Sequence, residues 1–239
     1  GISFNFLYLS SGGLTALIAV FCLLFFPNFR TEKKTITKLI IRRRYWLYYA
    51  LELLSGARRQ IFVVFAAFMM VEKFGFEVHQ LTALFLINLV INIFAAPLFG
   101  YFIAHFGERR ALLIEYSGLI CVFLAYGGIY LFDWGVVLAA TLFVLDHLFF
   151  GLRIALKTYF QKISSPEDIA PTAAVALSIN HIAAIFLPVL LGLLWLVSPT
   201  IVFMVAAFLA FLSFLLALLV PKLPIDGNEI LPIPKTYSK

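Results

Sequence analysis

The strongest constraint on this chain is the length of its apolar stretches. Seven of them run for about 20 residues, which is the length an α-helix needs to cross roughly 30 Å of hydrocarbon. Transmembrane β-strands would show alternation over about ten residues instead. Hydrophobic residues make up 63% of the 239 positions and charged residues 13%, whereas soluble domains average roughly half and a quarter. The sequence therefore predicts an all-α integral membrane protein with about seven transmembrane helices in a lipid bilayer.

The apolar runs divide the chain into four parts. The predicted spans are residues 3–27, 46–71, 81–103, 111–131, 136–157, 172–195 and 201–220. The parts are a transmembrane helix over 1–28, a basic linker over 29–45, a six-helix membrane domain over 46–220 and a tail over 221–239. Ile36, Leu39 and Ile40 indicate a short interfacial helix in the linker. The tail is rich in proline and polar residues, and we expect it to be poorly ordered.

The N-terminal residues are not expected to form a signal peptide, because they lack a basic region. The missing initiator Met indicates the start of a fragment.

The placement of lysine and arginine predicts the orientation. Apart from Arg58, Arg59 and Lys73, all of the 18 basic residues lie in or beside alternate connections, namely 29–45, 105–110, 153–162 and the C-terminal tail. Cytoplasmic loops of membrane proteins carry such an excess. We therefore expect these connections and the C-terminus to be cytoplasmic, and residues 73–80 and 132–135 to lie outside. The net charge of +6 follows from this bias and from anionic headgroups, so no nucleic-acid partner is expected.

Charged side chains within the second span are the first candidate site. An arginine at the centre of a membrane helix costs about 2.5–3.5 kcal/mol. Glu52 and Arg59 are seven residues apart and share a helix face, so we interpret them as an interior pair that binds or gates an anion. Arg58 points about 100° away and needs a partner of its own. There are two alternatives to a role in anion binding. The pair could be a structural ion pair, or both arginines could extend to the cytoplasmic interface of the membrane.

Later spans carry further polar residues. Asn88 and Asn92 are one turn apart and are typical of hydrogen bonds between helices. Asp146 lies close to intramembrane histidines, so proton coupling is a hypothesis; the alternative is that each polar group satisfies a neighbour. The complete predicted substrate or ion pathway consists of Glu52, Arg58, Arg59, Asn88, Asn92, Asp146, His147, Arg153, Asn180 and His181.

Enzyme and metal motifs are missing from the sequence. It contains no P-loop, nucleophile elbow or zinc spacing, so we expect no catalytic residue, metal or cofactor. Cys22 and Cys121 lie in apolar runs and are interpreted as small core residues rather than a disulfide. Glu115 is expected to tether the basic pair of Arg109 and Arg110.

A loop between the third and fourth spans carries a family resemblance. It reads Gly100-Tyr-Phe-Ile-Ala-His-Phe-Gly107-Glu-Arg109-Arg110-Ala-Leu112. These glycines, the basic pair and the leucine resemble the cytoplasmic signature loop of the major facilitator superfamily, although Ala104 stands where that family usually has aspartate. From Tyr45 onward the chain looks like the C-terminal six-helix half of such a transporter. The basic linker resembles the loop that joins the two halves, and the first span would be the last helix of the N-terminal half.

The resemblance implies a bundle built of two inverted three-helix repeats. A trace of the repeat is the recurrence of Gly56-Ala-Arg58 as Gly151-Leu-Arg153. It further implies a secondary transporter for a small solute in the bacterial plasma (inner) membrane, of which this chain is the C-terminal half or a truncated form. A second chain or segment would then supply the missing N-terminal helices. The excess positive charge on the second and fifth spans favours an anionic solute.

Two other functions remain open. A non-transporting subunit with the same fold could scaffold or assemble a membrane complex, which the missing helices favour and the buried charges disfavour. A seven-helix receptor would share the predicted orientation. However, the last span lacks the retinal-binding lysine and the Asn-Pro pair that such receptors carry.

Overall fold

The computed structural model describes residues 4–26 and 41–231. The chain divides into two units, Gly1–Ile36 and Thr37–Lys239. The first unit contains one apolar helix, α1 (Phe4–Phe25). Within the described ranges, seven helical segments are long and apolar enough to cross a membrane. The predicted all-helical fold with seven helices of membrane-spanning length and composition is thereby confirmed.

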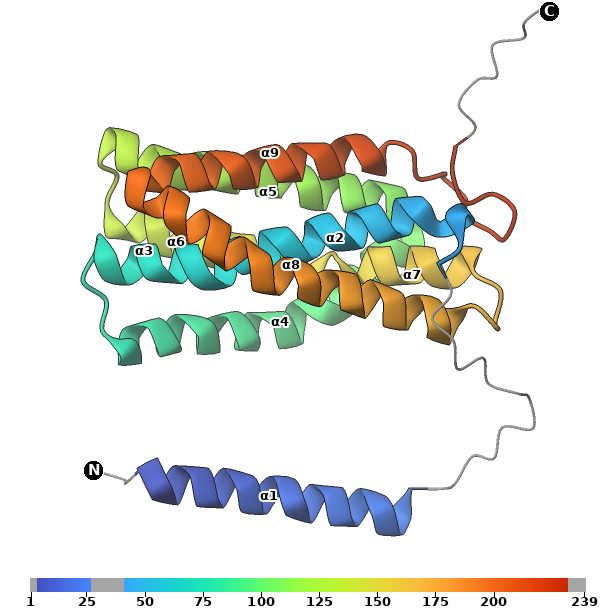
Figure 1. Cartoon of the computed structure of the whole chain (residues 1–239), viewed down its shortest axis with the longest axis horizontal. Helices are drawn as coiled ribbons and strands as arrows, with labels where there is room; N and C mark the ends of the chain where they lie inside the picture. Colours follow the sequence, from blue (N-terminus) through green and yellow to red (C-terminus); the bar gives the residue numbers. More distant parts are fainter. Residues whose placement is uncertain (1–3, 27–40, 232–239) are drawn as a thin grey trace, which may run out of the picture. The chain divides into compact units, whose positions relative to one another are not determined.

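The second unit is a bundle of the remaining helices (Figure 1). In chain order they are η1 (Arg43–Tyr45), α2 (Trp46–Gln60), η2 (Ile61–Ala66), α3 (Ala67–Glu72), α4 (Val78–Phe106), α5 (Glu108–Phe132), α6 (Val136–Gly151), α7 (Ile154–Ile163), α8 (Ile169–Val197) and α9 (Pro199–Ala217). Every predicted span is present. The bounds differ by a few residues because helices continue past the apolar run into polar residues near the membrane surface.

Two of the membrane spans are interrupted. Between α2 and α3 the backbone is π-helical over Ile61–Ala66, and a turn at Leu152 and Arg153 separates α6 from α7. Each interruption lies within a few residues of one of the two Gly-Xaa-Arg tripeptides. Irregular helical backbone within a membrane is tolerated where it is buried in protein or lines a cavity, and it often marks a functional position.

The helices pack in a regular set of contacts. α5 lies along α9, α2 crosses α8, and α6 crosses α4; α2 also contacts α9, and α6 contacts α5 (Figure 1). Glycines set both crossings. A Cβ added at Gly56 would lie 2.9 Å from Cγ of Asn180 on α8, and one at Gly151 would lie 2.5 Å from Cε2 of Phe99 on α4. Small residues let membrane helices approach this closely.

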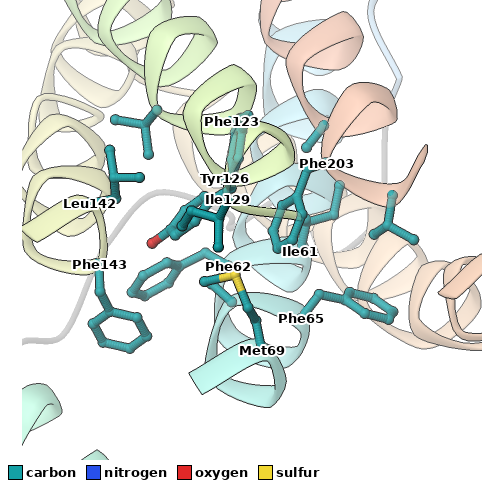
Figure 2. Close-up of a cluster of buried hydrophobic side chains, with 14 of the residues drawn as sticks. Ile61, Phe62, Phe65, Met69, Phe123, Tyr126, Ile129, Leu142, Phe143 and Phe203 are labelled. Carbon is teal, nitrogen blue, oxygen red and sulfur yellow. The ribbon is translucent and has the colours of Figure 1, made fainter. Parts of the chain in front are cut away.

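An aromatic core fills the centre of the bundle. Figure 2 shows Phe62 of η2 among side chains of α5, α6 and α9, including Phe123, Phe143 and Phe203. The rings of Phe62 and Phe143 are 4.7 Å apart between centroids. Tilted ring pairs at such distances add to the packing that area burial supplies.

Both cysteines lie on exposed helix surfaces and carry free thiols. The prediction that Cys22 and Cys121 are core residues is therefore wrong. A membrane helix is apolar on its lipid-facing side as well, so an apolar run does not identify the inward face.

The basic connections meet at one end of the second unit. The α4–α5 junction, the α7–α8 loop and residues 221–231 lie there, beside the start of α2, while residues 73–77 and 133–135 lie at the opposite end (Figure 1). This separation is what the orientation prediction requires. Which end faces the cytoplasm stays a prediction.

Part of the predicted tail packs against the bundle. The Leu231 amide donates to the Leu219 carbonyl at 2.8 Å, and the Tyr159 hydroxyl donates to the Glu229 carbonyl at 2.5 Å. The expectation of a poorly ordered tail is therefore wrong for residues 221–231. Residues 232–239 and the predicted interfacial helix at Ile36, Leu39 and Ile40 fall outside the described residues.

Candidate functional site

Arg58 lies in the centre of the bundle, with a side chain only 1% exposed. Its Nη2 is 3.6 Å from Oε1 of Glu115 on α5, whose side chain is fully buried. The guanidinium also lies 4.4 Å from the centre of the Tyr116 ring, a cation–π contact. Glu115 is thus the separate partner that Arg58 required. The expectation that Glu115 tethers Arg109 and Arg110 is wrong, because Glu115 faces the bundle interior.

Glu52 pairs with a residue from another span. Its Oε2 accepts a hydrogen bond from Arg153 Nη2 at 2.5 Å and from Asn180 Nδ2 at 3.4 Å. The predicted pair of Glu52 and Arg59 is not formed, and Arg59 is exposed. Seven residues along a helix place two side chains on one face but separate them by about 10 Å. The turn between α6 and α7 instead brings Arg153 against α2.

Two cavities collect most of the predicted pathway residues. The larger, about 450 Å³, is named the polar cavity; it is lined by Glu52, Arg59, Arg153, Lys157, Asn180 and His181, among others. The smaller, about 230 Å³, is named the aromatic cavity; it is lined by Arg58, Arg59, Asp146 and His147 and by the rings of Phe62, Phe85, Phe123 and Phe150. Arg59 lines both cavities. The breaks in the second and fifth spans therefore place charged residues beside two cavities, of which the polar cavity is open to the surface of the unit.

Several buried polar atoms in and near the aromatic cavity have no hydrogen-bond partner. They include Oδ1 of Asp146, whose residue is 2% exposed, and the three guanidinium nitrogens of Arg58. A buried polar atom without a partner costs about 1–3 kcal/mol, and more when it is charged. Each such group in a native structure calls for an occupant such as water, an ion or a ligand.

The asparagines and the exposed histidine are placed less centrally. Asn88 is buried without a hydrogen-bond partner for its amide, and Asn92 is half-buried. Neither lines the polar or the aromatic cavity. His181 is exposed on α8, where its Nδ1 lies 3.0 Å from the Leu177 carbonyl, although it does line the polar cavity.

The signature-like loop forms the junction between α4 and α5. Gly107 adopts a φ of +82° there, a conformation that favours glycine, whereas Gly100 lies within α4. Glu108 is buried and pairs with Lys162 at 2.5 Å, which joins the loop to α7. Arg109 and Arg110 form no ion pair with any residue that the structure describes.

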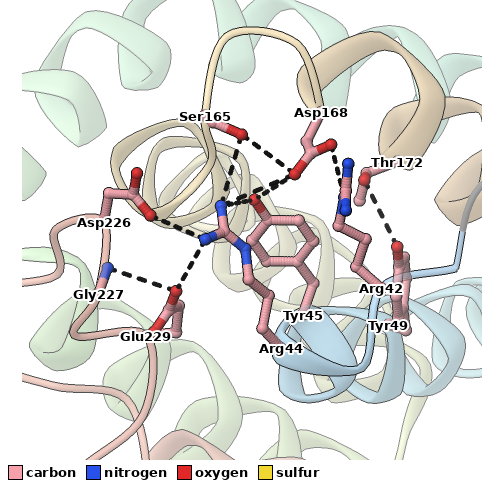
Figure 3. A network of polar contacts seen from close by, with 10 residues as sticks. All are labelled: Arg42, Arg44, Tyr45, Tyr49, Ser165, Asp168, Thr172, Asp226, Gly227 and Glu229. Carbon is pink, nitrogen blue, oxygen red and sulfur yellow. Dashed lines mark hydrogen bonds and ion pairs between the residues drawn. The ribbon is translucent and has the colours of Figure 1, made fainter. Parts of the chain in front are cut away.

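An ionic network joins three segments at the basic end (Figure 3). We name it the end clasp, and it consists of Arg42, Arg44, Asp168, Asp226 and Glu229. Arg42 Nε donates to Asp168 Oδ1 at 2.7 Å, while Arg44 Nη1 lies 3.1 Å from Asp226 and 3.7 Å from Glu229.

Asp168 is the acceptor at the centre of the end clasp. Burial alone would raise the pKa of its carboxyl, but hydrogen bonds from Arg42, Tyr45 and Ser165 outweigh burial and hold that pKa below its ordinary value. The carboxylate is therefore charged at neutral pH.

Sequence reasoning gave Glu115 the wrong partner and missed the ion pairs of Glu108 and Asp168. Glu115 could have been assigned to the interior, because an acidic residue within an apolar span calls for a partner. The pairs of Glu108 and Asp168 lie at helix ends, which sequence periodicity does not place relative to one another.

No protein-family model matches the chain, and no curated protein sequence matches it. Among the residues described, no group of three His, Cys, Asp or Glu side chains is placed to hold a metal ion.

Proposed function

We propose that this chain belongs to a secondary transporter that moves a small solute across a bilayer. The observation that carries the proposal is the pair of interrupted spans. Each contributes an arginine to an ion pair with another span, and each contributes residues to a cavity. Interrupted membrane helices beside charged residues are typical of substrate sites in transporters.

The packing supports two inverted repeats of the major facilitator type. The first repeat would be α2–α3, α4 and α5, and the second α6–α7, α8 and α9. In this scheme α2 corresponds to α6, α4 to α8, and α5 to α9. The contact of α2 with α8 then corresponds to the contact of α6 with α4, and the contact of α2 with α9 corresponds to that of α6 with α5. The contact between α5 and α9 corresponds to itself. Gly56 and Gly151 sit at the two equivalent crossings. A pseudo-twofold arrangement of this kind is expected of inverted repeats.

The polar cavity favours an anionic group on the solute. Three of its lining residues, Arg59, Arg153 and Lys157, are cationic, and Glu52 alone is acidic. The pair of Glu52 and Arg153 leaves Arg59 and Lys157 without an ion-pair partner among the described residues. Their positive potential would attract an anion.

The orientation follows the basic residues. We place the end clasp and the α4–α5 junction on the cytoplasmic side of a bacterial inner membrane, because the lysine and arginine excess lies there. Rocking of the six-helix unit against a second bundle, supplied by another chain or segment, would open the cavities alternately to either side.

Metabolite profiling tests this function. Cells that express the full-length protein should accumulate or release at least one small anionic or zwitterionic solute relative to cells without it. The Arg153→Ala variant should lose the difference, since it removes the partner of Glu52. Arg43→Ala is the matched control, because Arg43 is an exposed arginine that lines neither cavity and lies outside the signature-like loop; it should retain the difference.

Membrane insertion of each variant is verified by its amount in purified membranes. Identical profiles for wild-type and empty cells would reject transport and favour the scaffolding subunit.

A further inference from the structure

We propose that the aromatic cavity binds a small zwitterion with an apolar body, such as an α-amino acid with a hydrophobic side chain. This inference rests on the proposed transport function and names its substrate class. It follows from the charges, the rings and the size of the cavity.

Two groups on the cavity have no ion-pair partner among the described residues. The guanidinium of Arg58 pairs with Glu115, whereas Arg59 and Asp146 form no ion pair with any described residue. Asp146 is also 2% exposed, and its Oδ1 lacks a hydrogen-bond partner. A ligand with an ammonium for Asp146 and a carboxylate for Arg59 would supply a partner to both groups.

The guanidinium of Arg58 supplies further donors. Its nitrogens are buried without hydrogen-bond partners, and Arg58 lines the same cavity as Arg59. Two guanidinium groups can bind one carboxylate with several N–H donors. The carboxylate end of the ligand is therefore assigned to the two arginines and the ammonium end to Asp146.

Apart from His147, the remaining wall is apolar. Phe62, Phe85, Phe123 and Phe150 contribute their rings, and the rings of Phe62 and Phe85 meet edge to face at 6.4 Å. Such a wall accepts an aliphatic or aromatic group and gives no polar contact to a sugar or an inorganic ion. The volume of about 230 Å³ lies below the roughly 300–1,000 Å³ of pockets for drug-sized ligands, so the body must be small.

Arg59 also gives the ligand a route. Because this side chain lines both cavities, it can hold the carboxylate in the polar cavity and keep it as the apolar body enters the aromatic cavity. The cationic residues of the polar cavity and those of the aromatic cavity then bind the same carboxylate one after the other.

Binding to the purified full chain in lipid nanodiscs tests the assignment by calorimetry. The probes are L-phenylalanine and its two one-charge analogues, 3-phenylpropionate without the ammonium and phenethylamine without the carboxylate. Phenylalanine should bind at least about tenfold more tightly than either analogue, because each analogue leaves Asp146 or Arg59 without a partner. L-Leucine should also bind, as a zwitterion with a smaller apolar body.

Two variants test the individual contacts. Asp146→Asn should bring the affinities for phenylalanine and 3-phenylpropionate close together, because the partner of the ammonium is lost. Arg59→Gln should narrow the difference between phenylalanine and phenethylamine. Each ratio is measured within one variant, so partial misfolding does not alter it. Arg43→Ala lies outside the cavity and should keep both ratios.

The outcomes separate this inference from the proposed function. Equal binding of phenylalanine and its analogues, or no binding of either amino acid, would overturn the zwitterion site. So would unchanged ratios in both cavity variants. If profiling then finds a transported anion, transport stands and the zwitterion assignment falls. Selective phenylalanine binding with no flux in reconstituted vesicles would support the site and reject transport.

Discussion

Arg58 illustrates how a single charge is held inside this bundle. Its guanidinium contacts the Glu115 carboxylate and the Tyr116 ring, with almost no exposure. The helical periodicity of α2 places Arg58 on a different face from Glu52, so it showed that Arg58 needs a separate partner. It could not identify Glu115, because the rotation of α5 about its own axis is set by packing and is not encoded in the spacing of α2. For the same reason Glu52 was assigned to Arg59 instead of Arg153.

Removal of one member of the buried pair should be far more costly than removal of both. Glu115→Gln keeps the volume but leaves the Arg58 charge uncompensated, so we expect a loss of about 3–5 kcal/mol in the free energy of unfolding. The double variant with Arg58→Met and Glu115→Leu buries no charge and should lose much less. Denaturant titration in detergent micelles measures both.

The control for that experiment is Glu167→Gln, which removes an exposed carboxylate and should change stability by no more than about 0.5 kcal/mol. A double variant as unstable as Glu115→Gln would contradict the assignment of the pair as a charge-compensating unit.

The sequence was most informative about the number and positions of the helices. The bilayer fixes the length of a spanning helix, so apolar run length alone located all seven spans. The interruption at Ile61–Ala66 was not predicted, because that segment contains neither proline nor glycine. A π-helical segment of this kind depends on the neighbours that the helix packs against.

The crossing of α2 and α8 depends on the absence of a side chain at Gly56. In Gly56→Ala the new Cβ would lie 2.9 Å from Cγ and 3.2 Å from Cα of Asn180, so the helices must separate. We expect destabilisation by about 1–3 kcal/mol, the usual cost of overpacking. A lower thermal unfolding midpoint in detergent checks this.

Gly192→Ala on α8 is the matched control, since nothing lies within 4 Å of its Cβ position. Alanine has the higher helix propensity, so this control should be neutral or slightly stabilising. If Gly56→Ala and Gly192→Ala have the same thermal unfolding midpoint, the packing of α2 against α8 does not depend on the close approach at Gly56.

For the whole molecule, the separation of the loops between two ends is the feature that sequence and structure share. Alternation of basic and non-basic connections identified which loops meet, and the six-helix unit places them together (Figure 1). The end clasp could not be predicted, because it joins Arg44 to residues more than a hundred positions away.

Cysteine accessibility in intact cells tests the orientation. In a background with Cys22 and Cys121 replaced by serine, a membrane-impermeant maleimide should label Asp133→Cys from outside. It should label Lys222→Cys only after the cells are permeabilised, because basic connections are retained in the cytoplasm. Labelling of Lys222→Cys in intact cells, together with protection of Asp133→Cys, would show that the protein has the opposite orientation in the membrane.

The end clasp also has a consequence for the order in which the protein is made. About 180 residues separate Arg44 from Asp226, so a ribosome that adds roughly 5–20 residues per second needs on the order of 10–40 s to supply that carboxylate. During this interval the start of α2 has already emerged, but the carboxylates of Asp226 and Glu229 that pair with Arg44 do not yet exist. The contacts of Arg44 with Asp226 and Glu229 therefore form only after α9 has been synthesised, whereas the pair of Arg42 and Asp168 can form before α8 and α9 exist.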